Sequence, residues 1–134
     1  MTIHLKKLAV GISSINSLIE RQNMIFENYG ELIHLTRNKP KREIELISGG
    51  SLFWIIKRQV YVRQKILKIK DISDHTGKKS TGIILENKLI KVRPTPMRPF
   101  QGWRYYPEEE IPPDIDEGNF SDEFNAELSK LGLY

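Results

Sequence analysis

The chain has 134 residues, no cysteine, 39% hydrophobic residues and a formal net charge of +4 at pH 7. These values are typical of one globular domain, and they exclude disulfides, thiolate catalysis and cysteine-based metal sites. The first residues lack the apolar stretch of a signal peptide, and no segment has the roughly 20 apolar residues that span a bilayer. We therefore expect a cytoplasmic protein with no membrane partner.

The charge is unevenly divided along the chain. Residues 107–134 contain nine acidic side chains and one basic side chain, a net charge of −8, whereas residues 1–106 contain 20 basic and eight acidic ones, a net charge of +12. A body this basic attracts polyanions, although ordinary solvated charge is an equally common explanation. We predict a single domain over residues 1–115 and an acidic C-terminal extension over residues 116–134.

Four elements are predicted before residue 50. Residues 3–10 alternate apolar and polar side chains, which indicates a strand. Apolar residues at helical spacing follow a Ser13 or Ser14 cap and stop at Gly30, which predicts a long helix. Residues 31–36 form a second strand. A short helix with Pro40 in its first turn then ends at Gly49-Gly50.

The remaining elements are mostly strands. Residues 51–57 are largely apolar, which predicts a central strand buried on both faces. Residues 60–72 form its long antiparallel partner, and residues 82–86 and 89–92 add shorter strands. In the acidic extension, a Ser121 cap and an apolar stripe of Phe124, Leu128 and Leu131 predict a short amphipathic helix.

These elements predict an α+β fold. We expect a mostly antiparallel sheet of about five or six strands, because the connections are short, with one long and one or two short flanking helices. A half-closed barrel fits the pattern as well as an open sheet does.

The segment from Arg98 to Tyr105 carries the most distinctive chemistry. Its arginine planes and aromatic rings can stack on unpaired bases, Gln101 can contact a base edge, and Gly102 permits close backbone approach. The alternative is that the aromatic side chains anchor the loop to the core. The candidate nucleic-acid-binding residues here are Arg98, Phe100, Gln101, Trp103, Arg104 and Tyr105.

Three other segments are candidates for binding phosphate. A basic cluster around Pro40 can neutralise a phosphate backbone, and Arg63 and Gln64 lie in the long strand, where Arg63 would alternatively pair with Glu43 or Glu45. Gly49, Gly50 and Ser51 can present backbone amides to a phosphate, although a helix C-cap is the commoner use of such a pair. The basic cluster comprises Arg37, Lys39, Lys41 and Arg42.

The sequence shows no motif of a catalytic site or of a metal site. His4, His34 and His75 are far apart and lack the spacing of metal ligands. No nucleophile elbow, phosphate-binding loop or dinucleotide fingerprint is present. We therefore predict no catalytic residues, no metal and no cofactor, which favours a non-catalytic protein.

Several of these segments together resemble the bacterial family catalogued as domain of unknown function 1489. The resemblance covers about residues 3–115, with the acidic stretch after Asp116 outside it, and it implies a bacterial cytoplasmic protein without assigning an activity. The chain is also faintly similar to small RNA-binding barrels of the PUA and ASCH type. The segments similar to the family are His4-Leu5, Lys7-Leu8, Val10-Gly11, Thr36-Arg37, Pro40-Lys41-Arg42, residues 49–57, Arg63-Gln64, Ile66, residues 98–105 and Pro113-Asp114.

The leading hypothesis from the sequence is a non-catalytic module that binds RNA or another polyanion. Exposed aromatics beside arginine suit unstacked bases, and no recognition helix for duplex DNA is evident. One alternative is an enzyme or binding protein for a small anionic ligand such as a nucleotide. Another is a structural domain whose basic face binds an acidic protein. The sequence does not indicate an oligomeric state.

Overall fold

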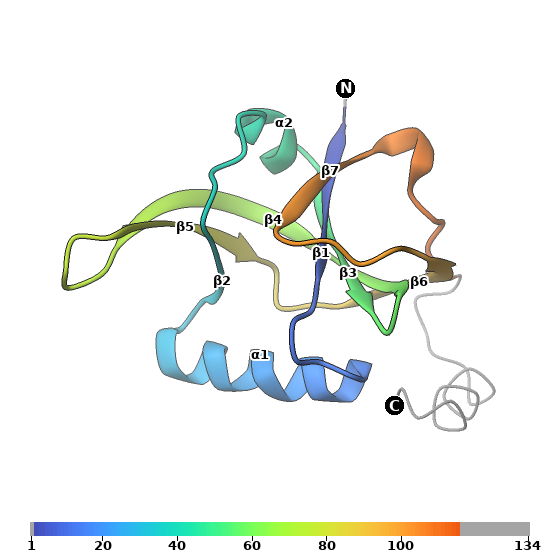
Figure 1. Cartoon of the computed structure of the whole chain (residues 1–134), viewed down its shortest axis with the longest axis horizontal. Helices are drawn as coiled ribbons and strands as arrows, with labels where there is room; N and C mark the ends of the chain where they lie inside the picture. The colour runs from blue at the N-terminus through green and yellow to red at the C-terminus, as the bar shows by residue number, and fades with distance from the viewer. Residues whose placement is uncertain (1, 116–134) are drawn as a thin grey trace.

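The computed structural model describes residues 2–115, and Figure 1 shows how its elements are arranged. Two helices, one 3-10 turn and seven strands follow one another along this part of the chain. Their order is β1 (Ile3–Leu8), α1 (Ile15–Tyr29), β2 (Leu32–Thr36), α2 (Glu43–Ile47), β3 (Ser51–Ile56), β4 (Gln59–Ser73), β5 (Lys79–Leu85), β6 (Ile90–Pro96), β7 (Trp103–Pro107) and η1 (Glu108–Glu110). The helix predicted over residues 121–131 lies outside the described residues.

The strands form one seven-stranded sheet in the order β2-β5-β4-β3-β1-β7, with β6 paired to β4 beside β5. The predicted α+β class is confirmed, but the sheet is mixed, because β1 runs parallel to β3. The long crossover through α1, β2 and α2 makes this parallel pairing sterically accessible. The sheet has more strands than the five or six expected, and over residues 2–115 it is not closed into a barrel (Figure 1).

Strand β7 was not expected, because the sequence analysis treated its residues as part of a loop. It pairs antiparallel with β1 in a register that places Lys7 opposite Trp103 and Ile3 opposite Pro107. The partner strand is about 100 residues away in the chain, so no local turn signal marks the pairing. The end of the Arg98–Tyr105 segment is therefore held rigidly at the sheet edge.

Helix α1 begins and ends as the sequence predicts. The Ser17 amide donates to the Ser14 hydroxyl oxygen over 3.1 Å, and Gly30 takes the left-handed conformation, with a φ of 72°, that favours glycine at a helix end. Helix α2 is shorter than expected and begins after Pro40. Neither helix of residues 2–115 has the length and hydropathy needed to cross a membrane.

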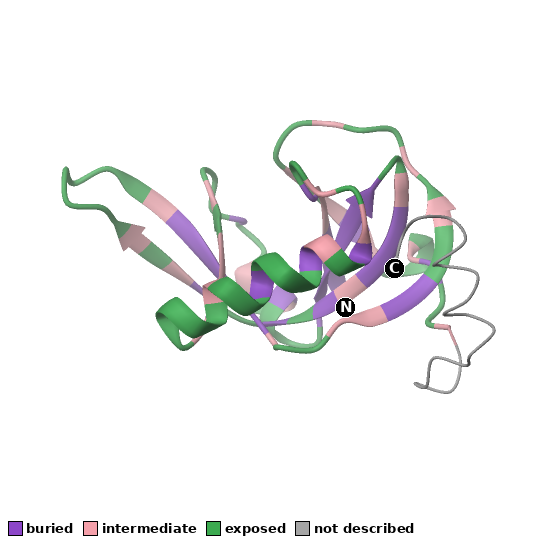
Figure 2. Cartoon of the chain, turned by 90° about the horizontal axis from the view of Figure 1, so that it is seen from below, coloured by how far each residue is buried: buried purple, intermediate pink, exposed green. Residues whose placement is uncertain are grey.

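Strand β3 lies at the centre of the core. Each of its six residues is buried, because β1 and β4 flank its two edges and side chains cover both of its faces. Figure 2 shows this burial along the middle of the sheet, together with the exposed outer face of α1. The far end of the β4–β5 hairpin extends away from this core (Figure 1). The prediction of a doubly buried central strand is confirmed.

His34 on β2 is a partly buried titratable group whose Nε2 atom is shielded from solvent and has no hydrogen-bond partner in the described part of the chain. Its ring packs edge-on against Trp54 with 5.0 Å between centroids. Burial, with added repulsion from Lys7 and Arg21, lowers the pKa of His34 from 6.5 to about 4. The ring is therefore neutral in the folded protein at pH 7.

This depressed pKa predicts a pH dependence of stability. Between pH 6.5 and about 4 the unfolded chain binds a proton that folded His34 excludes, so the stability fully present above pH 6.5 is lost as the pH falls through this window. The loss approaches about 3 kcal/mol at its acid end. Urea denaturation at pH 7 and pH 4.5 should show this loss in the native chain and a much smaller one in His34→Leu. Equal losses in both proteins would contradict the assignment.

Candidate functional site

Two segments that the sequence analysis treated separately meet in the structure. The indole Nε1 of Trp103 donates to the carbonyl oxygen of Asn38 over 2.9 Å. The amide of Arg42 donates to the hydroxyl oxygen of Tyr105 over 3.1 Å, and the Arg42 guanidinium lies 5.6 Å from the Tyr105 ring centroid. These contacts fix the chain after β2 against β7.

A polar pocket of about 620 Å³ lies where these segments meet β1. We call it the β1–β2–β7 pocket. Among residues 2–115, two cations and two carboxamides line it, and no carboxylate does. The described part of the chain offers no hydrogen bond or ion pair to the side chains of Lys7, Arg37, Asn38 or Gln101, so they are available to a ligand. The lining residues are Lys7, Leu35, Thr36, Arg37, Asn38, Gln101, Gly102 and Trp103.

Lys7 is the pocket residue that the sequence analysis missed. It lies opposite Trp54 of β3 and Trp103 of β7 in the strand registers, so the three side chains lie on the same face of the sheet. Partial burial lowers the pKa of its ammonium group. The Lys6-Lys7 pair on a strand was the available signal, because alternation sends the two side chains to opposite faces. Asn38 carried no signal of its own.

The aromatic residues of the Arg98–Tyr105 segment are engaged within the protein. Phe100 is half-buried and packs against the smaller of two core clusters, and the Arg104 guanidinium lies 4.5 Å from its ring centroid. Trp103 packs against the larger cluster and also lines the β1–β2–β7 pocket. The rings therefore anchor this loop, while Gln101 and Gly102 between them are exposed.

Several predicted phosphate-binding cations already have acidic partners. Lys39 lies 3.3 Å from a Glu43 carboxylate oxygen and 3.6 Å from one of Asp71. The Arg42 Nε donates to Glu45 over 2.8 Å. Lys41 and Arg98 are exposed and, like Arg37, have no ion pair within the described residues.

Gly49, Gly50 and Ser51 form a helix end rather than an open anion nest. The Gly50 amide donates to the Leu46 carbonyl, and the Ser51 amide donates to His4 Nδ1 over 2.9 Å. A Cβ atom at Gly50 would collide with the carbonyl oxygens of Ile3 and Leu46, so close packing explains this glycine. Two of the three predicted phosphate donors are thus already used.

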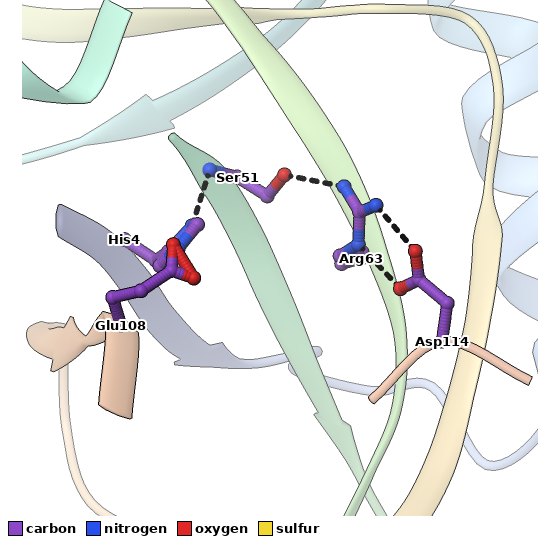
Figure 3. Close-up of polar contacts among 5 residues, drawn as sticks. All are labelled: His4, Ser51, Arg63, Glu108 and Asp114. Carbon is purple, nitrogen blue, oxygen red and sulfur yellow. Dashed lines mark hydrogen bonds and ion pairs between the residues drawn. The ribbon is translucent and has the colours of Figure 1, made fainter. Parts of the chain in front are cut away.

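A polar network joins side chains of β1, β3 and β4 to the exposed carboxylates of Glu108 and Asp114 (Figure 3). His4 Nε2 lies 3.0 Å from Glu108 Oε1, and a neutral ring with its hydrogen on Nε2 satisfies both His4 contacts. Arg63 makes paired 2.7 Å hydrogen bonds to Asp114 and donates to Ser51 Oγ over 2.9 Å. Arg63 pairs with Asp114 rather than with Glu43 or Glu45, and it lowers the pKa of that carboxyl group.

This network is built for structure rather than for nucleophilic catalysis. His4 faces the Ser51 amide and not its hydroxyl oxygen, which accepts instead from Arg63. A serine nucleophile needs a base that takes its hydroxyl proton, and Ser51 is buried. No group of three potential metal ligands occurs within residues 2–115.

Gln64 is a core residue, because its side chain has no exposed surface. Its Oε1 accepts from Gln22 Nε2 and from Trp54 Nε1, each over 2.7 Å. Its Nε2 donates to Gln22 Oε1 over 2.9 Å and to the Glu86 carbonyl over 3.2 Å. These four bonds link α1, β3, β4 and the end of β5.

Comparison with known proteins places this fold in a family without assigning a chemistry. A family model described as "Protein of unknown function (DUF1489)" matches residues 5–134. The match therefore includes the stretch after Asp116 that the sequence analysis placed outside the resemblance. No curated protein and no solved structure matches the chain, so the likeness to PUA and ASCH barrels is not confirmed.

Substituting Gln64 and Gln101 in turn tests whether Gln64 stabilises the core while Gln101 is an exposed residue of the β1–β2–β7 pocket. Each buried polar group left without a partner costs about 1–3 kcal/mol, so Gln64→Ala should lower the free energy of unfolding by about 3 kcal/mol or more. Gln101→Ala removes an exposed side chain and should change it by less than about 0.5 kcal/mol. Urea denaturation measures both values, and similar values would refute the distinction.

Proposed function

The chain belongs to the DUF1489 family, and we propose that it is a non-catalytic module that binds single-stranded RNA, with one phosphate held in the β1–β2–β7 pocket. The observation that carries this proposal is the set of polar side chains that line the pocket and have no hydrogen-bond or ion-pair partner within residues 2–115. Lys7 and Arg37 supply positive charge, Asn38 and Gln101 supply amide donors, and no carboxylate from the described part of the chain competes with an anion.

The electrostatics of Lys7 and Arg37 favour a phosphate over a neutral ligand. Lys7 is partly buried and its pKa is lowered by desolvation, so an anion beside it restores the interactions that water would otherwise provide. Arg37 is exposed at the rim, and its planar fork suits two phosphate oxygens.

The geometry favours single strands over duplex DNA. Helix α1 contains Arg21 as its one basic residue beside Glu20 and Glu27, and α2 contains Glu43 and Glu45 with no basic residue. Neither helix has the charge that a major-groove helix needs to approach two phosphate backbones. The exposed Gln101-Gly102 turn can instead contact a base edge or a 2′-hydroxyl of an unpaired nucleotide.

A small anionic ligand such as a nucleotide is the second candidate, and one observation favours it. The pocket volume of about 620 Å³ falls within the range of small-molecule sites, roughly 300–1,000 Å³. The same four polar side chains would then contact a single nucleotide.

Replacing Arg37 tests the RNA proposal against a matched control. Fluorescence anisotropy with a labelled single-stranded RNA should show affinity that falls between about 50 and 200 mM salt, because bound phosphates release counterions. Arg37→Ala should weaken binding and reduce the slope of log K against log salt by about 0.7, the value for one phosphate contact in a single strand.

Arg93→Ala is the control, because Arg93 is also exposed but lies on β6, which pairs with β4 and not with the pocket strands. It should bind nearly as the native chain does. Equal weakening by both substitutions, or binding that does not respond to salt, would overturn the proposal.

Thermal denaturation separates the two candidate functions. A ligand that binds only the folded state stabilises it by about 2.7 kcal/mol at a hundred times its Kd. For an RNA module, a single-stranded oligonucleotide should raise Tm more than any nucleoside mono- or diphosphate at equal phosphate concentration. A larger rise with one mononucleotide, lost in Gln101→Ala, would instead favour the small-ligand function.

A further inference from the structure

A second pocket lies beside Gln22 of α1 and belongs to neither function proposed above. We call it the α1 pocket. It has a volume of about 300 Å³ and lies between one side of α1 and the connection from β5 to β6. Ile19 is 37% exposed beside it, which leaves apolar surface in contact with water. The lining residues are Ile15, Ile19, Gln22, Asn23, Asn87, Lys88, Leu89 and Lys91.

The last described residues of the chain lead to the edge of this pocket. Asp114 forms a bridge with Val92, and the Ile115 amide donates to the Lys91 carbonyl over 2.9 Å. Lys91 itself lines the α1 pocket. Ile115, the last described residue, therefore lies beside the pocket, and the 19 residues from 116 to 134 are long enough to reach any part of it, since an extended chain spans about 3.3 Å per residue.

The composition of residues 116–134 complements this pocket. They contain five acidic side chains and one basic side chain, a net charge of −4, and Phe124, Leu128 and Leu131 recur at the spacing of one helical face. The pocket offers the apolar side chains of Ile15, Ile19 and Leu89, and two lysines. An apolar stripe beside carboxylates fits an apolar surface beside ammonium groups.

The family match supplies an independent reason to treat this segment as part of the domain. It extends through residue 134 and does not stop at residue 115. The apolar residues of the segment are thus part of the family match, and leaving such residues in water is unfavourable.

We propose that residues 116–134 bind the α1 pocket of the same chain, with the apolar stripe of Phe124, Leu128 and Leu131 covering Ile19 and Leu89. The carboxylates of the segment then lie near Lys88 and Lys91. This inference does not depend on the RNA-binding proposal, because no residue between 2 and 115 lines both the α1 pocket and the β1–β2–β7 pocket.

A single nitroxide label tests this inference in the full-length protein. The chain contains no cysteine, so Ser129→Cys provides one labelling site within the segment. Paramagnetic broadening should weaken the amide signals of Ile19, Asn23 and Leu89 strongly and leave those of Thr76 and Gly77, in the turn of the β4–β5 hairpin, almost unchanged. Adding Leu128→Ser and Leu131→Ser to the labelled chain should remove the effect, because these changes delete the apolar stripe without altering the described domain.

A sample that mixes two differently labelled proteins shows whether the α1 pocket is occupied by a segment of the same chain or of a second copy. Isotope-labelled native protein combined with nitroxide-labelled protein without isotopes reports only contacts between molecules. Strong broadening in the single-protein sample and none in the mixed sample supports binding within one chain. Equal broadening in the mixed sample would assign the pocket to a second copy, and no selective broadening in either sample would mean that the segment does not occupy it. Either of these results overturns the proposal.

Discussion

The antiparallel pairing of β7 with β1 is the constraint on which the candidate site depends. It holds Trp103 opposite Lys7, and the bond from Trp103 Nε1 to the Asn38 carbonyl then fixes the chain that follows β2. Because β1 is also paired with β3, its alternation of side chains is rigid. Lys7 is directed to the pocket and Lys6 to the opposite face, where it lies 4.8 Å from the Tyr106 ring centroid.

Electrostatic pairing decides which cations remain available to a ligand. The basic body predicted from the sequence contains many cations, yet Lys39, Arg42 and Arg63 are engaged by Glu43, Glu45 and Asp114. The lowered pKa values of Glu45 and Asp114 reflect this engagement. What distinguishes the β1–β2–β7 pocket is therefore that none of its lining residues between 2 and 115 is a carboxylate, rather than the number of its cations.

Local patterns predicted much of the fold, and long-range pairing supplied the rest. Ser14, Gly30 and the apolar run of β3 carry short-range signals that the structure confirms. The parallel β1–β3 pair and strand β7 could not be inferred, because their partners are far apart in sequence and no turn joins them. For the same reason the sequence could not show that Gln64 is buried against Gln22, or that Lys7, Arg37 and Gln101 share one pocket.

Titration of isotope-labelled protein with single-stranded RNA, followed by NMR chemical shifts, tests the central claim most directly. The account predicts that the largest changes fall on the amides of Lys7, Arg37 and Gln101 and on the Trp103 indole N–H, with little change at the β4–β5 hairpin turn. Shifts confined to the hairpin turn or to the outer face of α1, with the pocket residues unaffected, would contradict it.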